Sequence, residues 1–108
     1  ACKIFCVKTI TLHSEALDDL AQSVRFYEQT DNREIALVFI TQVQIAIAMI
    51  GEDPRRFPRV HGYQPVQKCR VRGFPHSLYY INTTSRIWVI AVAHGSRRPG
   101  FWTDRLHS

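Results

Sequence analysis

The run Arg86-Ile-Trp-Val-Ile-Ala-Val-Ala93 is apolar at nearly every position. Such a run is typical of an inner strand that is covered on both faces. Two further apolar runs precede it closely, at residues 66–72 and 77–82. Because such short connections join antiparallel neighbours, residues 66–93 are predicted to form a three-stranded antiparallel meander.

Upstream of the meander, apolar residues recur at three- and four-residue spacing in two segments. This periodicity predicts helices over about residues 14–30 and 33–50. Residues that commonly cap helices stand at the predicted ends. Ser14 is the expected N-cap of the first helix, Asp31 and Glu34 resemble a capping box at the start of the second, and Gly51 is expected to end it. The short link between the helices predicts an antiparallel hairpin, whose broad apolar face needs a sheet to cover it.

The remaining segments complete an α+β fold. Residues 3–12 are rich in β-branched and aromatic types, which predicts a first strand. The expected order is therefore an N-terminal strand, an αα-hairpin, the antiparallel meander and a short C-terminal tail that begins at His94. All of these elements are expected in a single domain of residues 1–108. A chain of this length buries only roughly two thirds of its unfolded surface, so stabilisation by a partner is plausible.

Charge divides the chain into two unlike halves. Residues 1–54 hold four Lys and Arg against eight Asp and Glu, a net charge of −4. Residues 55–108 hold ten cations, nine of them Arg, against Asp104 alone, a net charge of +9. This asymmetry predicts a positive surface for an acidic partner, either nucleic acid or an acidic protein segment. Arginine favours bidentate contacts with carboxylate or phosphate.

Several classes of function have no signal in the sequence. The apolar stretch Ile35–Ile50 is interrupted by polar residues, and the first residues lack the apolar region of a signal peptide, so we expect no membrane segment and no export. Cys2 and Cys6 lie too far apart on an extended strand to form a disulfide, which fits a reducing cytoplasm. The histidines lack ligand spacing and no phosphate loop is present, so neither a metal nor a cofactor is expected.

One candidate binding surface lies on the predicted strand 66–72. Alternation places Lys68, Arg70 and Arg72 on one face of this strand. Such a face is either a solvated outer surface that discourages aggregation or a binding surface. The positive charge of the whole second half favours binding.

A second candidate surface follows the central strand. His94 ends this strand close to Arg97 and Arg98. It is suited to act as an acid or base in phosphodiester cleavage while the arginines stabilise negative charge, although a structural histidine is the more common case. Phe101 and Trp102 either stack on bases or fix the tail to the domain.

Four segments of the chain form a distinctive set in their order and spacing. They are Arg25–Glu28, Pro54–Pro58, Phe74-Pro-His-Ser-Leu-Tyr-Tyr80, and the ending from Ala91 to Trp102, which contains His94 and Arg97-Arg98-Pro99. Together they resemble the RelE/ParE toxin superfamily of type II toxin-antitoxin systems over nearly the whole chain. The third segment and the ending look like the ParE branch. The family's fold is the one predicted above.

The resemblance implies a small cytoplasmic toxin that inhibits growth, serves plasmid stabilisation and forms a hetero-oligomer with a cognate antitoxin. ParE-type members inhibit DNA gyrase and are not enzymes, whereas RelE-type members cleave mRNA on the ribosome. In RelE-like chains an arginine commonly precedes the Leu-X-Tyr of the third strand, and Ser77 stands there in this chain. This difference favours gyrase over mRNA. A decayed member that only binds its antitoxin is a third possibility.

The leading hypothesis is thus a ParE-like gyrase inhibitor, with an mRNA interferase as the alternative. We expect the target to bind the tail through His94, Arg97, Arg98, Phe101, Trp102 and Arg105. We expect an acidic antitoxin segment to bind Lys68, Arg70, Arg72 and Tyr79. In the alternative, His94 is the acid or base, and Arg97 and Arg98 hold the phosphate.

Overall fold

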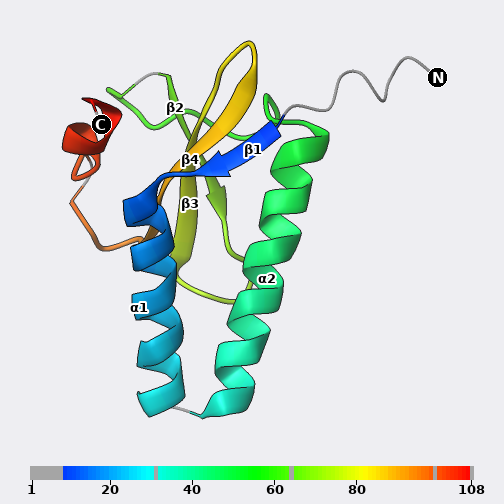
Figure 1. Ribbon diagram of the computed structural model, residues 1–108, viewed down its shortest axis with the longest axis vertical. Helices are drawn as coiled ribbons and strands as arrows, with labels where there is room; N and C mark the ends of the chain where they lie inside the picture. The colour runs from blue at the N-terminus through cyan, green and yellow to red at the C-terminus, as the bar shows by residue number, and fades with distance from the viewer. Residues whose placement is uncertain (1–8, 31, 64, 99, 108) are drawn as a thin grey trace.

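The computed structural model describes residues 9–30, 32–63, 65–98 and 100–107. Its elements, in chain order, are β1 (Thr9–Leu12), α1 (Ser14–Thr30), α2 (Arg33–Glu52), β2 (Val66–Arg70), β3 (His76–Asn82), β4 (Arg86–His94) and the 3₁₀ helix η2 (Thr103–His107) (Figure 1). The predicted element order is confirmed. The first six residues of the predicted strand 3–12, with Cys2 and Cys6, lie outside the described residues.

The strands form one mixed sheet in the order β1-β4-β3-β2. Strand β1 runs parallel to β4, and β2, β3 and β4 pair antiparallel as the predicted meander. Strand β4 is an inner strand, and its residues from Val89 to Ala93 are all buried. The predicted α+β fold is therefore confirmed.

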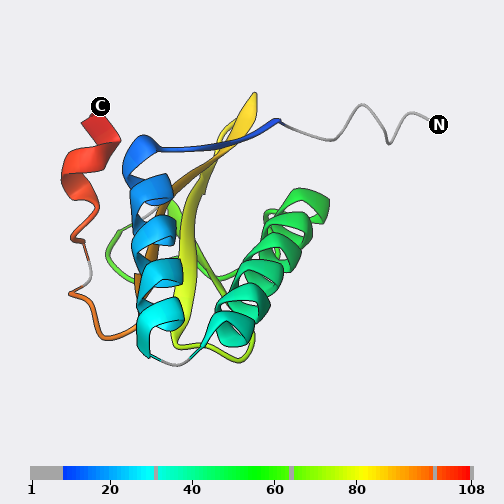
Figure 2. The same ribbon diagram turned by 60° about the horizontal axis from the view of Figure 1, so that its bottom comes forward.

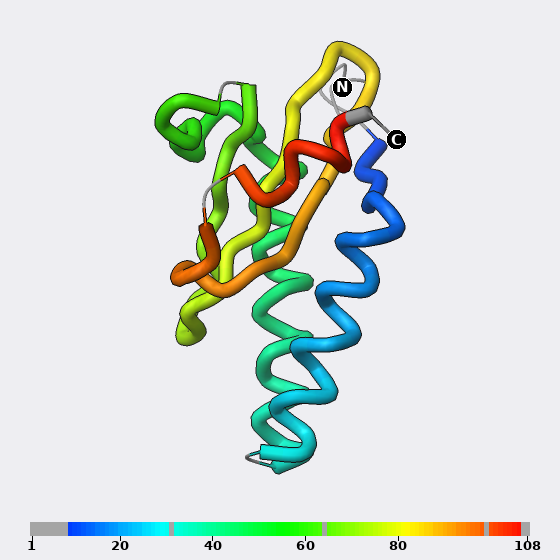
Figure 3. Tube along the Cα trace, turned by 90° about the vertical axis from the view of Figure 1, so that its left-hand side faces the viewer, coloured from blue at the N-terminus to red at the C-terminus, as the bar shows by residue number. Residues whose placement is uncertain are grey.

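The sheet carries a hydrophobic core on each face. On the helix side, the buried residues include Ala16, Tyr27, Phe39, Val43, Ile50, Leu78, Tyr80 and Val89. On the tail side they are Val66, Tyr79, Ile90, Ala91, Ala93 and Trp102. Figure 2 shows the tail and α2 on opposite sides of the strands, and in Figure 3 the tail crosses in front of them. The short tail thus covers the hydrophobic core on one face of the sheet, and the helical hairpin covers the core on the other face.

The helix starts differ from the sequence prediction. Helix α1 begins at Ser14, but the side chain that accepts a free N–H of its first turn belongs to His13, whose Nδ1 accepts from Glu15 N–H at 3.0 Å. Helix α2 is capped by Asn32, whose side chain accepts a first-turn N–H at 2.9 Å. The predicted cap Asp31 lies outside the described residues.

The end of α2 and its apolar character also differ from prediction. Gly51 lies inside the helix, and the C-cap is Asp53. By length and composition α2 could cross a membrane, so the expectation that its polar residues prevent this is wrong. Core helices of soluble proteins meet the same criterion. Since Phe39, Val43 and Ile50 of α2 pack in the helix-side core, the criterion is weak evidence for a membrane segment.

The arginine-rich connection that follows α2, residues 54–63, is called the basic loop, and it is anchored on the sheet by a buried amide. Gln67 Nε2 donates to the carbonyl oxygens of Pro54 at 2.8 Å and Phe57 at 2.9 Å. The hydroxyl of Tyr80 also donates to the Pro54 carbonyl, and burial raises the pKa of this phenol well above its usual value. These bonds satisfy loop carbonyls that would otherwise be buried without partners.

Strand β4 is irregular where β1 ends. Tyr79 pairs with Ala91 and Tyr80 with Val89, so Ile90 is an extra residue, as in a β-bulge. The pairing of β1 with β4 stops at Val89, and the backbone beyond this point needs other partners.

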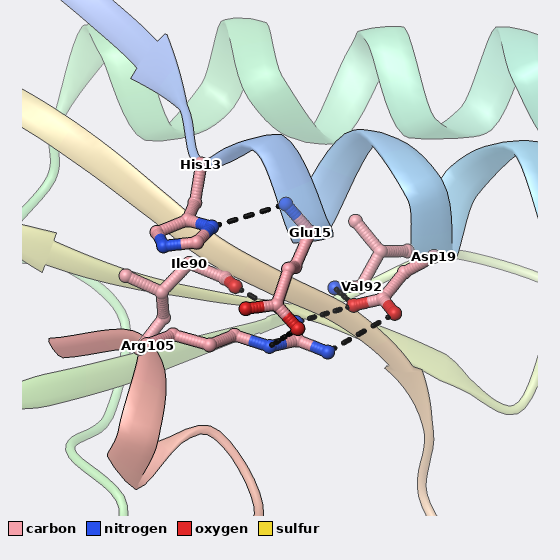
Figure 4. Close-up of polar contacts among 6 residues, drawn as sticks. All are labelled: His13, Glu15, Asp19, Ile90, Val92 and Arg105. Atoms are coloured by element: carbon pink, nitrogen blue, oxygen red, sulfur yellow. Dashed lines mark hydrogen bonds and ion pairs between the residues drawn. The ribbon is translucent and has the colours of Figure 1, made fainter. Parts of the chain in front are cut away.

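Two charged side chains supply those partners. Asp19 Oδ2 accepts from Val92 N–H at 3.2 Å, and Arg105 Nη1 donates to the Ile90 carbonyl at 3.0 Å. The same two side chains form an ion pair with an Nη1–Oδ2 distance of 2.6 Å, and both are about nine-tenths buried (Figure 4). The tail is thereby bonded to α1 and to β4 at a single point.

We expect Arg105→Met to lower the free energy of unfolding by about 3–5 kcal/mol, because it leaves the Asp19 carboxylate buried without a cation. Urea unfolding measures this change. The double variant Asp19→Leu/Arg105→Met, which buries no charge, should recover part of the loss.

The matched control is Glu15→Gln. Glu15 lies 3.7 Å from Arg105 Nε but is 54% exposed, so its loss should change the free energy of unfolding by less than about 1 kcal/mol. Equal effects of the Arg105 and Glu15 substitutions would contradict a special role for the buried pair.

Candidate functional site

The tail is fixed to the sheet by Trp102, which is 1% exposed. Its indole stacks on the Tyr79 ring of β3 with 4.5 Å between ring centroids. Phe101 meets both rings edge-on, and Tyr63 of the basic loop meets the indole edge-on at 5.7 Å. Because such aromatic contacts add to burial energy, the tail, β3 and the basic loop form one packed unit.

Arg97 and Arg98 are exposed in the turn that leads from β4 into this tail. The Arg97 guanidinium lies over the Phe101 ring, 4.0 Å from its centroid, in cation–π geometry. Together with Tyr63 and Phe101, both arginines line an open surface cleft of about 570 Å³. Cations beside aromatic rings on a fixed backbone suit a carboxylate or a phosphate of a partner.

His94 is exposed at the end of β4. Its Nδ1 accepts from Ser96 N–H at 3.0 Å and lies 2.8 Å from Ser96 Oγ. Its direct partner across the sheet is His76, and the two rings are 5.6 Å apart. His94 therefore belongs to a cross-strand pair of histidines on the helix side of the sheet, a pairing that the sequence did not indicate.

His76 was not predicted as a site residue. It is 7% exposed, and the rings of Tyr27 and Phe39 lie against it. Burial, and next the neighbouring His94, lower its pKa. Its Nδ1 is buried and has no hydrogen-bond partner among the residues that the structure describes. Only the strand register brings this residue to His94, so periodicity within the sequence gave no signal for it.

The residues expected to bind a target divide into two groups. His94, Arg97 and Arg98 are exposed at one end of the sheet, with the half-buried Phe101 beside them. Trp102 and Arg105 are 1% and 7% exposed, so they hold the tail in place and offer little surface to a partner. For Trp102, fixing the tail to the domain is thus the role that the structure shows.

The residues expected to bind an antitoxin are also not one surface. Lys68 and Arg70 are exposed on β2, opposite Tyr79 and Ser77 in the register. Tyr79 is 6% exposed and covered by the tail. The strand ends at Arg70, two residues before the predicted end, but the alternation continues past it, with Val71 buried and Arg72 exposed. Arg72 borders a cleft of about 560 Å³ that residues of both helices also line.

Metal-binding and thiol chemistry find little support in the described part of the chain. Within residues 9–30, 32–63, 65–98 and 100–107, no three His, Cys, Asp or Glu side chains are grouped to hold a metal ion. Cys69 is 2% exposed in the helix-side core, where burial raises the pKa of its thiol. It therefore packs as a small apolar side chain.

We expect the protein to lose stability in mild acid through His76. Its pKa in the folded chain is below the ordinary 6.5, so the unfolded chain binds more protons as the pH falls. The stability that neutral His76 contributes is complete above about pH 6.5 and is lost below it. Urea midpoints measured from about pH 8 to pH 5 should fall less steeply in His76→Gln than in the wild type.

The exposed His61 gives the control His61→Gln, which should keep the wild-type slope. A wild-type slope in His76→Gln would contradict the assignment.

Comparisons with known proteins identify the family and support the fold. The chain matches the family model for the ParE toxin of the type II toxin-antitoxin system, parDE, over residues 10–99. No curated protein matches it in a sequence comparison. A solved structure of the chromosomal ParDE TA system from P. aeruginosa shares its fold, with a TM-score of 0.73 at 13% identity over 82% of this chain and 96% of that one. The chain therefore belongs to the ParE toxin family of type II toxin-antitoxin systems.

Proposed function

We propose that this ParE-family toxin stops growth by binding DNA gyrase, and that a cognate antitoxin neutralises it. In this proposal the protein works in the cytoplasm and forms a hetero-oligomer with its antitoxin. The single observation that carries the proposal is the exposed group of His94, Arg97 and Arg98 on a backbone fixed by Trp102 and Arg105.

The fixed backbone is what makes this group suited to binding. Long arginine side chains lose conformational freedom when they bind, and prior placement reduces that loss. Arg97 already rests on the Phe101 ring, and the tail beneath it is stacked on β3. The exposed arginine surface is thus preorganised to bind carboxylates of a protein such as gyrase, or phosphates of the DNA that gyrase binds.

The alternative is cleavage of mRNA on the ribosome, with His94 as acid or base. It is favoured by the exposure of His94 next to Arg97. Against it, Ser77, at the position where RelE-type chains commonly carry an arginine, is 6% exposed. The sheet face around Ser77 also holds Tyr79, which the tail covers. We therefore prefer gyrase as the target.

We propose that the antitoxin binds elsewhere, around the edge of the sheet at β2, where Lys68 and Arg70 lie on the tail-side face and α2 covers the other face. Strand β2 is at the edge of the sheet and presents Lys68 and Arg70, which suit an acidic segment. Leu37, Val38 and Ile45 of α2 are each about half exposed, and apolar side chains of the antitoxin would cover them. The two surfaces predict that binding to antitoxin and binding to target can be separated by mutation.

The double variant Arg97→Ala/Arg98→Ala should abolish growth inhibition and inhibition of gyrase supercoiling. Both side chains are exposed, so the melting temperature should stay within a few degrees of the wild type. The matched control is Arg55→Ala/Arg56→Ala, which removes two exposed arginines of the basic loop and should keep full activity. Full inhibition by the folded Arg97/Arg98 variant would contradict the proposed surface.

The same preparations should be tested for mRNA cleavage on programmed ribosomes. Inhibited supercoiling with intact mRNA would support a gyrase inhibitor. Cleaved mRNA with normal supercoiling would instead make the protein an interferase and His94 the first residue to replace.

The antitoxin should raise the melting temperature of the toxin, because it binds the folded state alone. We expect Lys68→Glu/Arg70→Glu to weaken antitoxin binding at least tenfold, by charge repulsion with an acidic segment, while gyrase inhibition is retained. Calorimetric titration measures the first effect and supercoiling the second. Unchanged antitoxin affinity would contradict the placement along β2.

A further inference from the structure

A pocket of about 410 Å³ lies between α1 and the open end of the β3–β4 hairpin, where β3 begins and β4 ends. The residues that line it include Ser23, Phe26, Tyr27, Pro75, His76 and His94. We call it the histidine pocket. Apart from His94, none of these residues belongs to the predicted target-binding or antitoxin-binding sets.

The wall of the pocket on α1 holds the rings of Phe26 and Tyr27 beside Gln22 and Ser23, and the Phe26 ring is exposed. Phe26 is 55% exposed, and its ring meets that of Tyr27 edge-on at 5.3 Å. The closed end of the helical hairpin, where α1 finishes, extends beyond the sheet in Figures 1 and 3, so the sheet does not cover this region. An exposed aromatic side chain beside a concave apolar surface is a common feature of protein-binding sites.

Polar groups also line this apolar pocket. His76 and His94 are direct partners across β3 and β4, and His76 Nδ1 is buried without a hydrogen-bond partner among the described residues. A few convergent polar groups in an apolar pocket fix the orientation of whatever binds there. The pocket is therefore more than a gap left by imperfect packing.

The rim of the pocket is positively charged. An adjoining cavity of about 150 Å³ shares Ser23, His76 and His94 with the histidine pocket and is also lined by Asp19 and Arg97. The Asp19 carboxylate is paired with a buried arginine at 2.6 Å, so its charge is already balanced. Arg97 thus gives this rim its net charge, and it connects the pocket to the proposed target surface.

We infer that the histidine pocket takes an apolar side chain of the toxin's protein target, with a neighbouring carboxylate of that target on Arg97. This inference rests on the proposed function, whose target-binding surface it extends onto α1. Complementary charge points to an acidic segment, and the apolar wall suits a side chain better than a phosphate backbone. Continuity with Arg97 assigns the pocket to the target, since the proposed antitoxin surface lies around the edge of the sheet at β2.

The test compares two exposed apolar residues on the same helix. Phe26→Ala removes the pocket wall, whereas Leu17→Ala removes a side chain that is 52% exposed and does not line the pocket. We expect Phe26→Ala to raise the toxin concentration for half-inhibition of gyrase supercoiling at least tenfold, and Leu17→Ala to change it less than twofold. Ser23→Leu, which fills the pocket and keeps Phe26, should match Phe26→Ala. Thermal unfolding confirms that each variant is folded, and antitoxin binding should be unchanged in all three.

The other outcomes separate this inference from the proposed function. Wild-type inhibition together with full inhibition by the Phe26 and Ser23 variants would overturn the pocket's role and leave the gyrase proposal intact. A wild-type protein without effect on supercoiling would overturn the gyrase proposal and with it this extension. Loss of antitoxin binding alone would assign the pocket to the antitoxin, and loss of binding to a DNA duplex alone would assign it to nucleic acid. Either result would overturn the inference.

Discussion

The buried ion pair between Arg105 and Asp19 is the interaction on which the placement of the C-terminal tail depends. A buried charge is costly unless it is paired and hydrogen-bonded, and both conditions hold here. Each partner also bonds a backbone group of β4, at Ile90 and Val92, where β1 no longer pairs with that strand. Two side chains that are 86 residues apart in sequence thus complete the sheet's central strand.

This pair holds the tail over the sheet face opposite the helices, where Trp102 covers Tyr79. The tail begins with the turn after β4, where Arg97 and Arg98 are exposed. The tail that would present these arginines to a target therefore covers the sheet face near Ser77, which is one reason to prefer binding over catalysis on that face. In the proposed function, structural and binding roles divide between the buried and the exposed residues of one short segment.

The fold could be predicted because its main elements have strong local patterns, such as the apolar run of β4 and the helical periodicity of α1 and α2. The site could be predicted only in part, because burial of a charged residue depends on a partner far away in sequence. Arg105 has the sequence character of a surface cation, and only the fold brings Asp19 to it. Asp19 lies three residues after Ala16 on the inner side of α1, but the burial of both residues is seen only in the fold. The pairing of His76 with His94 had no such signal, because it depends on strand register.

We propose that the buried pair holds the tail in the conformation that binds the target. Inhibition of gyrase supercoiling by Arg105→Met, at a temperature where circular dichroism shows it folded, tests this claim most directly. We expect inhibition by this variant to be at least tenfold weaker than inhibition by the wild type, although Arg105 is too buried to contact gyrase itself. Inhibition equal to that of the wild type, with hydrogen exchange showing a released tail, would contradict it.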